Sequence, residues 1–141
     1  MSIGQAFFDT NVLLYMHSEA DLVKQALATD LLRRYEDSGN AILSTQVIQE
    51  FYARSRKLGM ARENMREVVN QFLRLHLVVN GPNEIRSAFR IEERYQISFW
   101  DALIVAAAES AGAEVLFTED LNDGQQYGSV LARNPFLTPE A

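Results

Sequence analysis

Residues 99–124 read FWDALIVAAAESAGAEVLFTEDLNDG, and this stretch decides how the chain folds. The residues from Ala102 to Ala108 are apolar on every side of a helix, which predicts that this helix is buried. Gly112 is expected to close the helix in the left-handed conformation that glycine adopts readily. The apolar run 114–118 predicts a strand directly afterwards, and an acid-rich loop follows it. A buried helix that leads into a short apolar strand indicates an α/β fold.

The rest of the chain shows the same alternation of helices and strands. Short apolar runs predict strands at 6–8, 41–44 and 76–79, and a further short strand at 130–131. Apolar residues at helical spacing predict helices at 11–17, 21–37, 47–57, 62–75 and 84–95. Such alternation indicates an α/β domain with a parallel sheet that helices cover on both faces. The 141 residues fit one domain of this kind.

The composition excludes several classes of protein. No cysteine is present, so disulfides, thiolate metal sites and cysteine nucleophiles are excluded together. No apolar run approaches the roughly 20 residues that span a bilayer, and residues 1–5 lack the features of a signal peptide, so we expect a cytoplasmic protein. The net charge of −6 argues against nucleic acid as a partner. However, acids that converge on cations in a cleft would leave the remaining surface closer to neutral.

Two acidic segments are expected at the same edge of the sheet. Asp9 follows the first predicted strand, and Asp120 follows the strand at 114–118. In parallel sheets, ligands bind beyond the carboxyl ends of the strands, where both acids would lie. Asp123 is a weaker second acid of this loop, and Glu119 should point away from Asp120 if the alternation of the strand persists. The alternative for the loop is a solvated turn, since Asn, Asp and Gly favour turns.

Asp9 has two interpretations of equal weight. It stands in the segment Phe8-Asp9-Thr10-Asn11, where Asp9 or Thr10 could simply cap the next helix. The alternative is a metal ligand at the end of a strand, with Thr10 or Asn11 fixing the orientation of its carboxylate.

Glu50 and Asp101 complete the set of candidate acids. Glu50 lies at the border of the apolar face of its helix, where a lone Glu is usually solvated, and only the other acids make it a candidate. Asp101 stands three residues after Ser98, which is the spacing of a capping box. However, a carboxylate in the first turn of a buried helix needs a partner, because an unpaired buried charge is costly. We therefore favour a functional role for Asp101.

A bound cation would account for the presence of several carboxylates in one place. Two carboxylates about 4 Å apart repel by roughly 4 kcal/mol at an effective dielectric of 20. A cluster would destabilise the fold or take up protons unless Mg²⁺ or Mn²⁺ neutralised it. Such ions prefer oxygen ligands and promote phosphodiester cleavage by activating water. Zinc fits less well because no paired His or Cys ligands occur, and we expect His17 at the surface and His76 at a strand edge.

Four segments of the chain match a known pattern in order and spacing. They are residues 8–11, Glu50, residues 99–104 and residues 118–124, and the ending 134–136 also fits. The chain resembles the PIN-domain family, and within it the VapC-type toxins of bacterial toxin–antitoxin pairs. The resemblance implies a single PIN domain over residues 1–141, with three α/β/α layers and a central parallel sheet of about five strands.

The resemblance also implies a function. It implies an endoribonuclease that depends on Mg²⁺ or Mn²⁺, forms a homodimer and is inhibited by a cognate antitoxin whose tail enters the active-site groove. The catalytic acids would be Asp9, Glu50, Asp101 and Asp120, with the metal held by Asp9, Asp101 and Asp120. Asp123 would be an accessory acid, and the supporting polar residues would be Thr10, Asn11 and Thr118. Other PIN-domain ribonucleases of RNA processing share these motifs, and a PIN fold that only binds is a further alternative.

Basic and aromatic residues offer candidates for contact with RNA. Arg86, Arg90 and Arg94 recur every four residues on one helix, and Arg54 belongs to a basic cluster after Glu50. Either group could hold phosphates, although interleaved acids make ordinary solvated helices an equal alternative. Tyr52, Tyr127 or Trp100 could stack on a base, but Trp100, beside a buried helix, is expected in the core.

Two other α/β classes fit the sequence poorly. A phospho-accepting receiver domain needs a late lysine, and no lysine follows Lys57. A phosphatase of the haloacid-dehalogenase type needs a second Asp two residues after the first, where this chain has Asn11.

Overall fold

Six strands form one sheet within residues 4–137, which the computed structural model describes. Their order across the sheet is β3 (His76–Val78), β2 (Ala41–Ser44), β1 (Ala6–Phe8), β4 (Val115–Phe117), β6 (Val130–Arg133) and β5 (Gln126–Tyr127). All neighbouring pairs are parallel except β5 and β6, which are antiparallel. The expected α/β fold with a parallel sheet is confirmed.

The sheet has one strand more than expected. The missed strand is β5, which has only two residues, one of them the polar Gln126, and therefore carries no apolar run. The short strand expected at 130–131 is β6 and extends to Arg133. β1 and β2 have the predicted bounds, because each is a fully buried apolar run.

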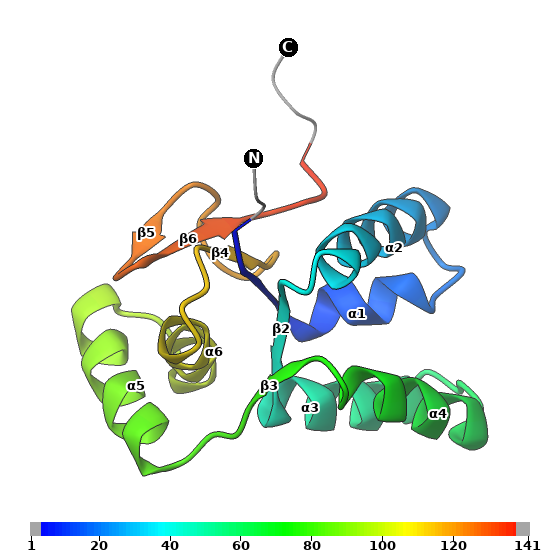
Figure 1. The fold of residues 1–141 in the computed structure, drawn as a ribbon, viewed down its shortest axis with the longest axis horizontal. Coiled ribbons are helices and arrows are strands. Elements are labelled where there is room, and N and C mark those ends of the chain that lie inside the picture. The colour runs from blue at the N-terminus through cyan, green and yellow to red at the C-terminus, as the bar shows by residue number, and fades with distance from the viewer. Residues whose placement is uncertain (1–3, 138–141) are drawn as a thin grey trace.

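Helices cover both faces of the sheet (Figure 1). α1 (Thr10–Met16), α2 (Leu22–Asp37), α3 (Thr45–Lys57) and α4 (Arg62–Phe72) lie on one side of the strands. α5 (Pro82–Tyr95) and α6 (Phe99–Ser110) lie on the other side. The connections from β1 to β2 and from β2 to β3 run in one direction along the sheet, and the connection from β3 to β4, which contains α5 and α6, runs back in the other. Because such crossovers are right-handed, the two groups of helices lie on opposite faces.

Residues 99–124 form the predicted buried helix followed by a strand. Residues 102–108 of α6 are all buried. Gly112 follows the helix with φ +75°, so it supplies the left-handed conformation that ends the helix.

α4 ends at Phe72, three residues earlier than expected, because residues 73–75 turn into β3. No helix within residues 4–137 is long and apolar enough to cross a membrane.

Candidate active site

Four carboxylates line one cavity of about 170 Å³. They come from four separate segments: Asp9 follows β1, Glu50 lies on α3, Asp101 lies in the first turn of α6, and Asp120 follows β4. β1 pairs in parallel with both β2 and β4, so the segments that follow these strands meet at one edge of the sheet. The structure thus brings the four sequence-predicted acids together. The other residues that line this cavity are Thr10, Gln46, Arg54, Trp100 and Ile104.

Asp9 is the most buried of these acids, with 6% of its surface exposed. Its Oδ1 accepts a hydrogen bond from the backbone N–H of Thr10 at 2.7 Å, and its Oδ2 accepts one from the Thr118 hydroxyl at 2.7 Å. Asp9 caps α1, so the capping interpretation holds as well as the one that places it in a site. Burial raises its pKa from 3.8 to about 6; these two hydrogen bonds oppose the rise, and the charges of Asp120 and Glu50 add to it.

Thr118 connects two of the acids. Its hydroxyl donates to Asp9 and accepts from the backbone N–H of Asp120 at 3.0 Å. Thr118 is itself fully buried, so this connection is sheltered from water. On the other side of the cavity, the Thr10 hydroxyl donates to Oε1 of Glu50 at 3.0 Å. The two threonines therefore hold three of the four acids in place.

Asp101 is half-buried at the start of α6. Its backbone N–H donates to the Ser98 hydroxyl at 3.1 Å, so the helix cap predicted from the spacing is present. Burial raises the pKa of the Asp101 carboxyl; a hydrogen bond from Ser98 opposes this, and the charges of Asp120 and Glu50 add to it. The helix cap and the position in the acidic cavity are therefore compatible.

Arg54 lies at the rim of the cavity. One guanidinium nitrogen, Nη1, donates to Oδ1 of Asn11 at 2.8 Å, and Nη2 lies 3.8 Å from Oε2 of Glu50. Of the two residues expected to orient Asp9, Thr10 contacts its carboxylate through the backbone N–H, whereas the side chain of Asn11 contacts Arg54.

Several sequence-predicted residues do not line the acidic cavity. Asp123 accepts a hydrogen bond from the backbone N–H of Asn134 at 2.8 Å and so connects its loop to the segment after β6. The three arginines of α5 also lie elsewhere: Arg90 and Arg94 line a separate cavity of about 230 Å³ with Glu109, and Arg86 contacts Asn83. Of the four arginines considered for RNA contact, the structure brings only Arg54 to the acids.

The structure corrects two predictions about single side chains. Trp100 is not a core residue: it is 63% exposed and lines the acidic cavity, because the first turn of α6 projects at the edge of the sheet. His17 is only partly at the surface: it is half-buried, and its ring lies 5.8 Å from that of Phe51 and 6.4 Å from that of Phe72. Burial lowers the pKa of His17. His76 is exposed on β3, as expected.

Gln46 is a lining residue that the sequence analysis did not single out. It is 7% exposed, and its Nε2 donates to the backbone carbonyl of Trp100 at 3.4 Å. A single polar residue beside an apolar helical run carries no signal of such a contact, since many such residues are solvated.

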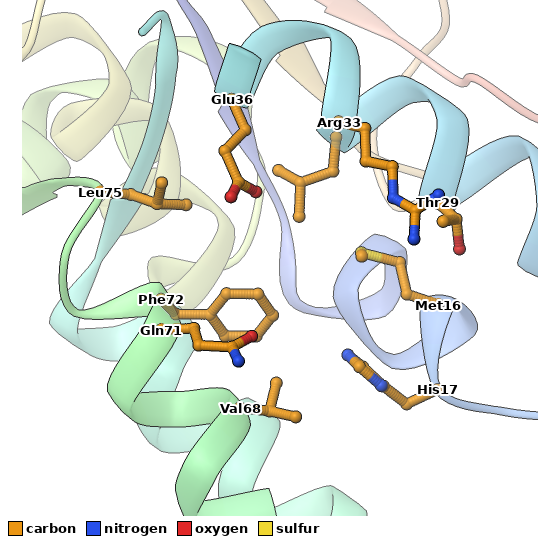
Figure 2. A pocket seen from close by; sticks show the side chains of 10 residues that line it. Met16, His17, Thr29, Arg33, Glu36, Val68, Gln71, Phe72 and Leu75 are labelled. Carbon is orange, nitrogen blue, oxygen red and sulfur yellow. The ribbon is translucent and has the colours of Figure 1, made fainter.

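His17 also points into a second cavity, of about 290 Å³, between α1, α2 and α4 (Figure 2). Apolar side chains such as Phe72 and Leu75 share its wall with Arg33 and Glu36. Because it contains one carboxylate and not a cluster, it is not the candidate active site.

Glu119 belongs to a group of contacts beside the acidic loop. Its Oε1 accepts from the Tyr15 hydroxyl at 2.7 Å, and its Oε2 pairs with Nζ of Lys24 at 2.6 Å. Lys24 Nζ also lies over the rings of Tyr15 and Phe136, 4.6 and 5.2 Å from their centroids. Glu119 thus contacts α1 and α2 and does not line the cavity, as the strand alternation predicted. These contacts hold the segment that carries Asp120.

We expect Lys24→Met to lower the free energy of unfolding by about 1 kcal/mol, the upper part of the range for partly exposed pairs. The loss is expected because the segment before Asp120 loses a contact with α2. Urea unfolding measures the effect. Lys57→Met, on α3 and outside these contacts, is the matched control; an equal loss in this variant would contradict the prediction.

The fold and the cavity together define a class: a parallel α/β domain with an acidic pocket at the carboxyl edge of its sheet. Residues 6–123 match the model of the PIN domain. Because the match covers most of the sequence, the chain belongs to the PIN-domain family, as its resemblance indicated. The match ends at residue 123, so a single domain over residues 1–141 stays a prediction.

Solved structures of toxin–antitoxin proteins share this fold. The chain is similar to a toxin–antitoxin complex from Klebsiella pneumoniae, with 19% identity, a TM-score of 0.73, and coverage of 94% of this chain and 98% of that one. It is also similar to VapC20 from Mycobacterium tuberculosis, described as a sarcin-ricin loop cleaving toxin (17% identity, TM-score 0.63, coverage 82% and 92%). A third similar structure is DNA-bound VapBC from Salmonella typhimurium, with 17% identity, a TM-score of 0.65, and coverage of 94% of this chain and 99% of that one. No curated protein matches the sequence.

Proposed function

We propose that this protein is a metal-dependent endoribonuclease and the toxin of a type II toxin–antitoxin pair. The observation that carries the proposal is the gathering of Asp9, Glu50, Asp101 and Asp120 around one small cavity. Four carboxylates in one place oppose folding through their mutual repulsion, so an arrangement of this kind points to a function that needs it.

The donor set fits a hard divalent cation. Asp9, Asp101 and Asp120 offer carboxylate oxygens, which Mg²⁺ and Mn²⁺ prefer. Within residues 4–137, no three Asp, Glu, His or Cys side chains are close enough together to hold one ion directly. Some of the three carboxylates would therefore contact the ion through water, which Mg²⁺ retains readily. The raised pKa of Asp9 is a second sign, because its buried carboxylate lacks a neutralising partner. When bound, the ion would help to activate water and to stabilise charge on the phosphate.

The remaining side chains have complementary roles in this proposal. Thr118 and the backbone N–H of Thr10 fix both oxygens of Asp9. Thr10 fixes one oxygen of Glu50, so that the carboxylate can accept the proton of the attacking water. Arg54 presents a guanidinium at the rim, where it can bind a phosphate of the RNA. Attack of water on phosphorus then breaks the bond to the leaving ribose oxygen.

The toxin role and the partners rest on the similar structures. Two of those described above are complexes of a toxin with its antitoxin, and one of these is bound to DNA. We infer a cognate antitoxin as the protein partner, a homodimer as the basic assembly, and the cytoplasm as the location.

The proposal predicts that the purified protein cleaves RNA with Mg²⁺ or Mn²⁺, because the cavity needs a cation. EDTA should abolish cleavage and excess Mn²⁺ should restore it, as seen on gels of total cellular RNA. Asp101→Asn, purified in the same way, controls for contaminating ribonucleases. Cleavage that survives EDTA or occurs equally with Asp101→Asn would contradict the proposal.

The toxin role is tested separately by inducing expression in bacteria. Growth should stop with the wild-type protein and continue with Asp101→Asn. Cleavage in vitro without growth arrest would favour a PIN-domain ribonuclease of RNA processing, and the absence of both would favour a binding module.

A further inference from the structure

Trp100 occupies an unusual place for a large apolar side chain. It directly precedes Asp101, it lines the cavity of the four carboxylates, and 63% of its surface is exposed. It is the only tryptophan of the chain and the only aromatic residue among the described residues that line this cavity. The indole therefore stands in solvent beside the place where a phosphodiester would be cut.

The backbone of Trp100 is held by regular structure. It belongs to the first turn of α6, whose following residues are buried. Its carbonyl accepts a hydrogen bond from the buried side chain of Gln46, and the ring of Phe99 lies 5.3 Å away at an angle of 72°. The backbone of Trp100 therefore has a fixed place relative to Asp101, in contrast to that of an aromatic residue on a free loop.

The other aromatic candidates for contact with RNA do not have this position. Tyr127 is 1% exposed and lies in the core. The Tyr52 hydroxyl accepts a hydrogen bond from Arg66, and Tyr52 lines another cavity with Val69 and Asn70. Of the three, only Trp100 is both exposed and beside the acids.

We propose that Trp100 is a specificity-determining residue that stacks on a base next to the scissile phosphate of an unpaired RNA segment. Stacking of an aromatic ring on a base contributes about 1–3 kcal/mol and needs a free face of that base. In a duplex both faces are covered by neighbouring bases, so an unpaired segment is selected. Arg54, at the rim of the same cavity, binds the backbone while Trp100 binds the base. This proposal rests on the ribonuclease function proposed above.

A protein partner on the same surface is the competing explanation. Phe89 is 55% exposed on α5, and its ring lies 5.9 Å from that of Phe99, so it is close to Trp100 without lining the acidic cavity. If this surface served mainly to bind another protein chain, Phe89 and Trp100 would matter alike for that contact and neither would matter for RNA. Phe89 is therefore the matched control.

The test uses the fluorescence of the single tryptophan. The wild-type protein is titrated with single-stranded oligo(A) and with its duplex with oligo(U), in Ca²⁺, which also takes oxygen ligands. Stacking should quench the emission with the single strand and leave it unchanged with the duplex. Trp100→Ala and Trp100→Phe contain no tryptophan, so their affinities are measured from the fluorescence anisotropy of a labelled single strand. Trp100→Ala should bind this strand about 5- to 150-fold more weakly, the range for one lost stack. Trp100→Phe should keep most of the affinity, and Phe89→Ala should keep all of it.

Each outcome separates this proposal from the ribonuclease function. Cleavage by the wild-type protein without quenching, or equal affinity for Trp100→Ala, overturns the stacking role and leaves the function intact. If Phe89→Ala and Trp100→Ala both disrupt the dimer in light scattering and neither weakens binding of the single strand, the stacking role is overturned in favour of a protein interface. Quenching and weaker binding by Trp100→Ala support it even where cleavage of the same RNA is slow.

Discussion

Asp9→Asn is expected to abolish cleavage of RNA and, at the same time, to stabilise the metal-free protein at neutral pH. The rate should fall by about 10²- to 10³-fold, as when an enzyme loses one group that stabilises charge in the transition state. The gain in stability has a different cause. Asp9 is almost fully buried, and its pKa is raised from 3.8 to about 6. Its charged form therefore destabilises the fold, and Asn carries no charge.

The sign of the pH dependence follows from this shift. Below about pH 4, Asp9 is protonated in both the folded and the unfolded protein, so it does not lower the free energy of unfolding. As the pH rises to about 6 and above, the unfolded chain ionises first, so stability is lost, by up to about 3 kcal/mol for a shift of about two pKa units. Asp9→Asn should remove this loss and leave stability near pH 4 unchanged.

Urea unfolding at pH 4 and pH 7.5 in EDTA measures the effect. Asp123→Asn is the matched control, because it makes the same chemical change outside the cavity, where Asp123 contacts the backbone of Asn134. Mn²⁺ should raise the melting temperature of the wild-type protein and of Asp123→Asn, and have little effect on Asp9→Asn. If Asp9→Asn is no more stable than the wild-type protein at pH 7.5, the carboxylate is not the strained group that its burial implies.

The sequence predicts well those features that local patterns determine. The bounds of β1 and β2 and the burial of α6 were predicted, because apolar runs between polar residues mark buried elements. The meeting of Asp9 and Asp120 was also predictable, since residues that follow parallel strands share one edge of the sheet.

The errors occur where tertiary position overrides the local pattern. The periodicity of α6 shows that the helix is buried but not that its first turn projects at the sheet edge, which exposes Trp100. Similarly, the four-residue spacing of the arginines on α5 shows a common stripe but not which cavity that stripe faces. Asn11 was placed beside Asp9 because the two are close in sequence, whereas its side chain contacts Arg54 on the neighbouring helix α3.

Thr118→Val is expected to reduce cleavage by about 10- to 100-fold, the usual loss when the hydrogen-bond partner of a metal-binding group is removed. Valine has nearly the same shape as threonine but can neither donate to Asp9 Oδ2 nor accept from the backbone N–H of Asp120. Leaving the buried Oδ2 of Asp9 without its hydrogen-bond donor also costs about 1–3 kcal/mol of stability. One substitution should therefore disturb two acids without enlarging or filling the cavity.

The pH profile distinguishes this connection from a general loss of packing. The Thr118 hydroxyl lowers the pKa of Asp9, so its removal should raise that pKa further above about 6. Because protons compete with the cation for Asp9, the acid side of the rate profile should move to higher pH, and half-maximal activity should need more Mn²⁺. Thr118→Ser keeps the hydroxyl and should retain the wild-type profile. A lower plateau with an unmoved acid side would show that Thr118 supports the fold but does not tune Asp9.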